Sequence, residues 1–204
     1  GAEFVLVSPM RDDLPDFVGA EWLPVVPGGD VAVMLALAHP LVDEGLHDRA
    51  FLDRSCVGFD RFEGYLRGVD DDRPKTPEWA ERLSGIPAAT IRSLARRMAA
   101  KRTLINVNWS LQRIEHGEQA PWTVVTLAAM LGQIGLPGGG FGQGYGSLGY
   151  VGRPPLRVGP PSLPRGTNPV HAFIPVARVA DMLLHPGEPF DFDGAFWRVR
   201  KPTS

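Results

Sequence analysis

The chain has 204 residues, 44% of them hydrophobic, so it can bury a sizeable core without disulfides or structural metals. Its formal net charge of −2 provides no basic surface for nucleic acid, and its single cysteine excludes an internal disulfide and a cysteine-based zinc site. No apolar run reaches the roughly 18 residues of a membrane span, and the first residues lack the pattern of a signal peptide.

The beginning of the chain predicts two strands and a buried helix. Short apolar runs at 4–7 and 22–26 each end at a turn that contains proline, which is typical of buried parallel strands. Every residue from 31 to 37 is apolar, and Asp30 precedes this run as a candidate N-cap. We therefore expect a helix that other elements cover on most sides.

Three more helices and a strand are predicted further along. Thr76 and Pro77 supply the start of a helix that should end at Gly85, and Pro87 begins another. The latter has an apolar stripe for the core and three arginines that we expect to face solvent. The stripe consists of Ile91, Leu94, Ala95 and Met98, and the arginines are Arg92, Arg96 and Arg97. A strand over 103–107 and a long apolar helix over 121–134 follow.

This order of elements predicts an α/β fold, an open, mostly parallel sheet with helices on both faces. The chain also has 24 Gly and 20 Pro, and these two types fill 17 of the 32 positions from 135 to 166. Such positions are unsuited to helix or strand interiors, so we predict an irregular Gly/Pro-rich segment after the α/β domain. The predicted divisions are an α/β domain at 1–134, a Gly/Pro-rich connection at 135–170, and a C-terminal extension with a short helix at 171–204. We expect 144–168 to be the least ordered stretch.

Ligands of open parallel sheets bind at the carboxyl ends of the strands, and three segments of this chain directly follow predicted strands. They are 8–11, 27–30 and 108–113. We expect them to form one rim.

The segment Gly28-Gly29-Asp30 opens a helix after a strand. Its backbone N–H groups and the helix dipole could hold an anion, and the Asp30 carboxylate could accept two hydrogen bonds from a guanine edge. The simpler alternative is that Asp30 only caps the helix. The segment is not a GxGxxG motif, so it gives little support to a nicotinamide site.

The segment 108–113 combines an aromatic plane, a hydroxyl, an amide and a guanidinium, supplied by Trp109, Ser110, Gln112 and Arg113. These groups can stack on a heterocycle and clamp a diphosphate or polarise an oxygen. The alternative is a polar loop in which the tryptophan packs and the arginine is solvated. His116 and Glu118 come next and form either an acid/base pair or the start of the following helix. The histidines show no ligand-like spacing, and we predict no metal ligand in this chain.

Several runs of the sequence can be compared with known families. They are PEWAE at 77–81, SGIPA at 84–88, NWSLQR at 108–113, HGEQ at 116–119 and AAMLGQIGLPGGGFG at 128–142, with further runs at 174–178 and 181–184. Together they resemble the molybdopterin oxidoreductases, in particular the branch of dimethyl sulfoxide, trimethylamine N-oxide and biotin sulfoxide reductases. The resemblance covers nearly the whole chain.

The resemblance implies an enzyme that carries molybdenum bis(molybdopterin guanine dinucleotide) and removes an oxygen atom from a small S-oxide or N-oxide. Its partners would be an electron donor and the remaining domains of the parent enzyme. This part would bind one guanine dinucleotide, with Trp109 and Arg113 also acting in catalysis. The implied cofactor-binding residues are Ser8, Pro9, Gly28, Gly29, Asp30, Trp109, Ser110, Gln112 and Arg113. Arg113 would hold the diphosphate or orient the substrate oxygen.

The family's serine ligand to molybdenum lies in an upstream domain that nothing here matches. We therefore expect an internal segment of a longer enzyme, inactive when isolated. The alternative is a stand-alone nucleotide-binding or structural module without redox activity. The resemblance is compatible with a bacterial cytoplasmic or periplasmic enzyme and does not select between the two compartments.

Overall fold

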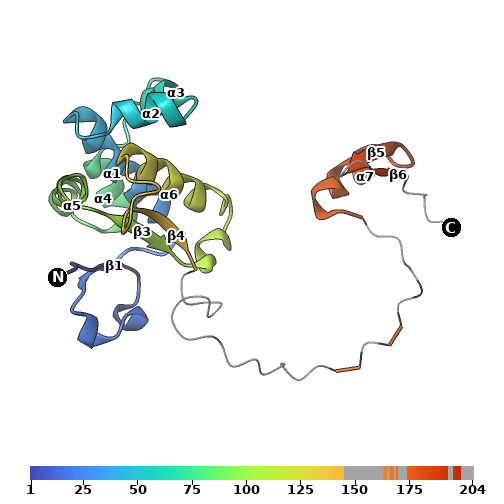
Figure 1. The fold of residues 1–204 in the computed structure, drawn as a ribbon, viewed down its shortest axis with the longest axis horizontal. Coiled ribbons are helices and arrows are strands. Elements are labelled where there is room, and N and C mark those ends of the chain that lie inside the picture. The colour runs from blue at the N-terminus through green and yellow to red at the C-terminus, as the bar shows by residue number, and fades with distance from the viewer. Residues whose placement is uncertain (145–162, 165, 168, 170–173, 193–194, 199–204) are drawn as a thin grey trace. The chain divides into compact units, whose positions relative to one another are not determined.

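The computed structural model describes residues 1–144, 163–164, 166–167, 169, 174–192 and 195–198. The chain divides into two compact units, Gly1–Leu156 and Arg157–Ser204. We describe each unit by itself (Figure 1).

The first unit contains four strands, six α-helices and three short 3-10 helices in its described part. In chain order they are β1 (Val5–Val7), η1 (Arg11–Asp13), η2 (Asp16–Val18), β2 (Glu21–Leu23), α1 (Asp30–Asp43), α2 (Arg49–Ser55), α3 (Phe59–Leu66), α4 (Pro77–Ser84), α5 (Ala88–Ala100), β3 (Leu104–Val107), η3 (Trp109–Gln112), α6 (Gln119–Met130) and β4 (Gly140–Gln143).

The strands of the first unit pair in parallel. β1 pairs with β2, with Val5 opposite Glu21, and β3 pairs with β4, with Leu104 opposite Gly140. α6 forms the crossover between β3 and β4, as a parallel pair requires. The α/β class and the parallel pairing are confirmed. The four strands form two separate two-stranded sheets.

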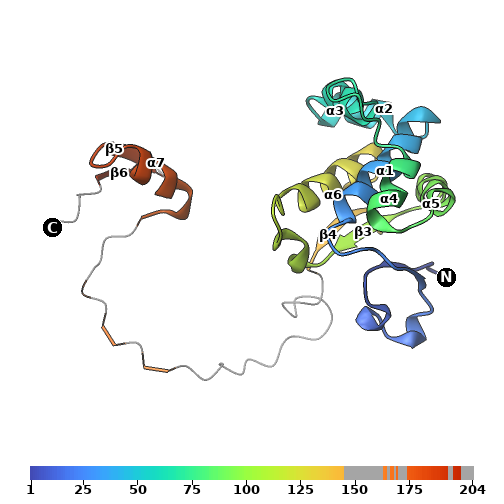
Figure 2. The same ribbon diagram turned by 180° about the vertical axis from the view of Figure 1, so that it is seen from behind.

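α1 lies at the centre of the core. All residues from Ala32 to Ala38 are buried, and Leu41 is fully enclosed. α4, α5 and α6 pack around this helix, as Figures 1 and 2 show. The prediction of a helix covered on most sides is therefore confirmed. Ile105 and Val107 of β3 pack against the same core, whereas Leu104 points to the other face and is exposed.

α4 and α5 form as their sequence signals predict. The Thr76 hydroxyl accepts a hydrogen bond from the Trp79 N–H at 3.2 Å, and α4 ends before Gly85, whose φ is 77°. The predicted apolar stripe of α5 is buried, at Ile91, Leu94, Ala95 and Met98.

The side chains of the three α5 arginines are partly or largely exposed, in keeping with the predicted solvated face, and they also have partners within the protein. Each guanidinium forms an ion pair with a carboxylate from another element. Arg92 pairs with Glu78, Arg96 with Glu44, and Arg97 with Glu3 and Glu21. Sequence spacing along one helix does not reveal such partners, because they lie before β1, in β2, just after α1 and in α4.

Three element boundaries differ from the sequence prediction. β2 ends at Leu23, because the following Pro24 has no N–H for a ladder. α6 runs from Gln119 to Met130, and Gly132 with a φ of 67° prevents its continuation to residue 134. Gly140–Gln143 forms β4 although it lies in the stretch predicted to be irregular. Pairing with β3 outweighs the low strand propensity of its glycines.

The second unit contains η4 (Val176–Arg178), α7 (Val179–Leu184) and the antiparallel strands β5 (Pro189–Phe192) and β6 (Ala195–Arg198). The predicted short helix of the extension is present. The hairpin of β5 and β6 was not predicted from the sequence. The expectation of low order at 144–168 falls mostly outside the described residues, and the three predicted divisions of the chain stay a prediction.

None of the helices in the described part has the length and apolar content needed to span a membrane.

Candidate functional site

The three segments predicted to form a rim follow strands that end at one edge of the first unit. The Asp48 N–H, just after α1, donates to the Met130 carbonyl at the end of α6 at 2.8 Å. α1 and α6 therefore run in the same direction. α6 starts where β3 ends, so the start of α1 lies at that same edge (Figures 1 and 2). β2 leads into α1, and β1 is parallel to β2, which places Ser8 there as well.

Ser8 is only 6% exposed, and all of its polar groups are engaged within the protein. Its hydroxyl donates to the Asp13 carboxylate and accepts from the Met10 N–H at 3.2 Å. Its carbonyl accepts from the Trp22 indole N–H at 2.9 Å, and its own N–H donates to Leu23 at 3.3 Å. Ser8 thus fixes the turn after β1, and the next residue, Pro9, is exposed.

The loop before α1 is packed against the end of α4. The Val26 N–H donates to the Ser84 carbonyl at 2.8 Å, and a Cβ added at Gly29 would lie 3.0 Å from the Ser84 Cα. Gly28 has a φ of 86° and open space where a Cβ would be. Glycine is therefore needed at 28 for its conformation and at 29 for close packing.

Asp30 is the first residue of α1, and Gly29 is its N-cap. The alternative in which Asp30 caps the helix is therefore wrong. Its half-buried carboxylate makes no hydrogen bond or ion pair with any residue that the structure describes. The helix dipole favours this negative charge in the first turn, and both carboxylate oxygens can accept from a ligand.

The segment after β3 forms the one-turn helix η3. The Asn108 side chain accepts from the Trp109 N–H at 2.7 Å, and the Arg113 N–H donates to the Ser110 carbonyl at 2.9 Å. Leu111 anchors this turn on the core. Trp109 as a whole residue is 39% exposed.

The polar side chains of η3 and of the residue after it have no partner among the described residues. This holds for the hydroxyl of Ser110, the amide of Gln112, the guanidinium of Arg113 and the indole N–H of Trp109. An aromatic plane, several donors and one positive charge are therefore available together on a rigid turn. Such a set can hold a planar heterocycle and a phosphate.

His116 and Glu118 lie where the chain enters α6. His116 has a φ of 55°, and its carbonyl accepts from the Gln119 N–H at 3.0 Å. The pKa of Glu118 is lowered, first by its own backbone N–H and next by the Gln119 amide, which donates at 3.3 Å. The His116 imidazole and the Glu118 carboxylate make no hydrogen bond with each other, so the geometry fits the helix-start interpretation.

Gly117 is a residue of this region that the sequence analysis did not identify. A Cβ at this position would overlap the Gln112 carbonyl, so the chain from η3 to α6 folds back directly on itself. Only its place in the HGEQ run could have indicated a role, because a lone glycine is not informative.

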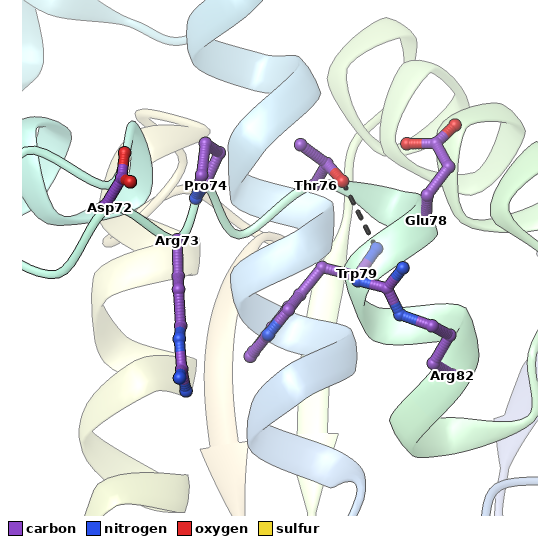
Figure 3. Close-up of a pocket in the computed structure, with 7 residues that line it drawn as sticks. All are labelled: Asp72, Arg73, Pro74, Thr76, Glu78, Trp79 and Arg82. Atoms are coloured by element: carbon purple, nitrogen blue, oxygen red, sulfur yellow. Dashed lines mark hydrogen bonds between the residues drawn. The ribbon is translucent and has the colours of Figure 1, made fainter.

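A hollow of about 500 Å³ lies beside α4, and none of the predicted site residues lines it (Figure 3). Lys75, between the lining residues Pro74 and Thr76 in the chain, is buried, and its ammonium pairs with Asp71 at 2.7 Å and lies 4.3 Å from the Tyr65 ring centroid. This ammonium holds the loop before α4 in place. The lining residues are Asp72, Arg73, Pro74, Thr76, Glu78, Trp79 and Arg82.

Within the described residues, no three His, Cys, Asp or Glu side chains are grouped as they would be around a metal ion.

The model of the family described as molybdopterin oxidoreductase matches residues 1–190. The chain is 50% identical to a biotin sulfoxide reductase of Cereibacter sphaeroides, over 95% of this chain and 26% of that protein. It is 47% identical to a dimethyl sulfoxide/trimethylamine N-oxide reductase of Rhodobacter capsulatus, over 95% of this chain and 25% of that protein. It is 45% identical to trimethylamine-N-oxide reductase 1 of Escherichia coli K12, over 94% of this chain and 24% of that protein.

The chain spans about a quarter of the length of these relatives. Among solved structures, acetylene hydratase from Pelobacter acetylenicus matches with a TM-score of 0.55 and 21% identity, over 66% of this chain and 18% of that one. This structure supports the fold alone.

Proposed function

The chain belongs to the molybdopterin oxidoreductase family, and on this basis we propose that it is part of a molybdenum enzyme that reduces S-oxides or N-oxides by oxygen-atom transfer. The family implies a molybdopterin cofactor. The names of the similar proteins, all reductases of S-oxides or N-oxides, support this choice of substrate class.

The role proposed for this segment is to bind one molybdopterin guanine dinucleotide. The observation that carries it is the half-buried Asp30 carboxylate, which has no partner among the described residues and begins α1. Guanine offers its N1–H and N2–H on one edge, and a carboxylate can accept both. The open space at Gly28 leaves room for a ligand to approach that carboxylate.

The other predicted residues fit the remaining parts of such a ligand. The Arg113 guanidinium can bind a diphosphate through two hydrogen bonds, or orient a substrate oxygen. The Trp109 indole can pack on a flat pterin ring, with Ser110 and Gln112 as hydrogen-bonding groups beside it. Ser8 contributes by fixing its turn, since its polar groups are engaged, and Pro9 supplies exposed surface.

The bound cofactor would supply the redox chemistry, in which two electrons and two protons convert the abstracted oxygen atom to water. The residues of this chain would bind the nucleotide and line the approach to the pterin. The remaining domains of the enzyme and an electron donor would complete the system, and the chain alone should show no turnover. The alternative, a module without redox activity, is not favoured by the family match.

Calorimetric titration of the chain with GDP tests the nucleotide site. We expect GDP to bind and Asp30→Ala to lower its affinity by about tenfold or more, because hydrogen bonds to a charged group contribute about 1.5–3 kcal/mol. Asp70→Ala is the matched control, since Asp70 is exposed and its carboxylate has no partner in the described chain. Equal GDP affinity in the Asp30→Ala and wild-type chains would contradict the guanosine role.

A further inference from the structure

Gly144 directly follows β4 and lies against the Trp109 side chain. Its N–H donates to the Val107 carbonyl at 2.8 Å, which extends the pairing of β3 and β4 by one step. A Cβ added here would overlap three atoms of the indole, Nε1, Cδ1 and Cε2, all closer than the 3.0 Å below which real Cβ contacts essentially do not occur. The backbone of Gly144 therefore occupies the space beside the pyrrole edge of this ring.

The same edge of the ring carries the polar atom of the indole. Nε1 makes no hydrogen bond with any residue that the structure describes, and Trp109 as a whole residue is 39% exposed. A methyl group at position 144 would either displace the ring or block the indole N–H from a hydrogen-bond acceptor. Glycine at 144 thus keeps both the ring position and its donor available.

We propose that Gly144 is a positioning residue for Trp109, which sets the placement of the indole at the edge where β3 and β4 end. The η3 turn fixes the backbone of Trp109 through the Asn108 side chain, and Gly144 fixes the ring from the neighbouring strand. A ring held from two strands is already ordered before a ligand arrives, which lowers the cost of binding a flat heterocycle. That consequence rests on the proposed function, whereas the contact itself does not.

Gly144 and Gly135 offer a matched pair of substitutions. Both have positive φ, 65° and 86°, so Gly144→Ala and Gly135→Ala introduce similar backbone strain. A Cβ at Gly135 has no heavy atom within 4 Å, whereas one at Gly144 meets the indole. Any difference between the two variants therefore reports the contact with Trp109.

The readout is the indole N–H resonance of Trp109 in a ¹H–¹⁵N correlation spectrum of the chain without ligand, assigned by its loss in Trp109→Phe. We expect Gly144→Ala to shift this resonance and Gly135→Ala to leave it in place. An unchanged Trp109 resonance in Gly144→Ala, or an equal shift in both variants, would overturn the proposal.

A second measurement covers the case in which Gly144→Ala folds poorly. If the clash with the indole is the cause, adding Gly144→Ala to Trp109→Ala should lower the melting temperature by no more than Gly135→Ala lowers that of the wild-type chain, because only the backbone strain remains. A double variant that loses as many degrees from Trp109→Ala as Gly144→Ala loses from the wild-type chain would contradict the proposal. Neither measurement uses GDP, so each outcome is independent of the titration that tests the nucleotide site.

Discussion

The turn after β1 and the turn after β3 lie at the same edge of the protein and carry similar residue types, yet their polar groups are used differently. In the first, every polar group of Ser8 bonds to the protein. In the second, the side chains of Ser110, Gln112 and Arg113 have no partner among the described residues. Residue type at a strand end is therefore not enough to assign a binding role. The partners of each polar atom distinguish a side chain such as that of Ser8, which the protein satisfies, from side chains that are open to a ligand.

The largest expected effect concerns Arg113 in the open turn. Arg113→Ala should weaken GDP binding by about tenfold or more, because a charge-assisted hydrogen bond contributes about 1.5–3 kcal/mol. It should change the free energy of unfolding by less than about 0.5 kcal/mol, since the guanidinium bonds to nothing in the described protein. Calorimetry and urea denaturation measure the two quantities.

Arg61→Ala is the control for that substitution, because Arg61 is exposed on α3 and also lacks a partner among the described residues. It should leave both quantities unchanged. A loss of stability in Arg113→Ala with GDP affinity intact would show that the Arg113 guanidinium, like the Ser8 hydroxyl, serves the fold and not a ligand.

An intermediate effect is expected from the two serines. Ser8→Ala should lower the free energy of unfolding by about 1 kcal/mol, because it removes the hydrogen bonds with Asp13 and Met10. Ser110→Ala should change it by less than about 0.5 kcal/mol. Urea denaturation of both variants gives the comparison directly, and equal losses would remove the distinction between the two turns.

The smallest effect concerns pH and the ion pairs of Glu3, which lies before β1, at the opposite end of this strand from the Ser8 turn. Hydrogen bonds from Lys101 and Arg97 lower the pKa of Glu3 below its ordinary value of 4.5. A carboxylate with a lowered pKa in the folded state stabilises that state above its unfolded pKa, and this contribution is lost as the pH falls through the folded pKa. Stability should therefore fall slightly as the pH drops below about 4.5, and less so in Glu3→Gln. An identical pH profile for wild type and Glu3→Gln would contradict this attribution.

The sequence predicted most elements of the first unit because their signals are local. The cap at Thr76, the stop at Gly85 and the apolar stripe of α5 each depend on residues within a few positions. β4 was missed because its glycines argue against a strand and only its pairing with β3 overrides them.

The three rim segments could be placed from the order of strands and helices. Which of their side chains are free for a ligand, and what holds them in position, depends on contacts between residues distant in sequence. Asp30 was predicted either to bind or to cap, and only the structure assigns the cap to Gly29. The contact between Gly144 and Trp109 joins residues 35 positions apart and has no signature in either segment.

The most direct test of the account is the composition of a full-length protein that carries this chain, purified from cells supplied with molybdate. Acid hydrolysis should release GMP, and metal analysis should give molybdenum, in a ratio of about two GMP to one molybdenum. The Asp30→Ala protein should hold less of both. A purified protein with no molybdenum, or with molybdenum and no GMP, would contradict the claim that this chain binds a molybdopterin guanine dinucleotide.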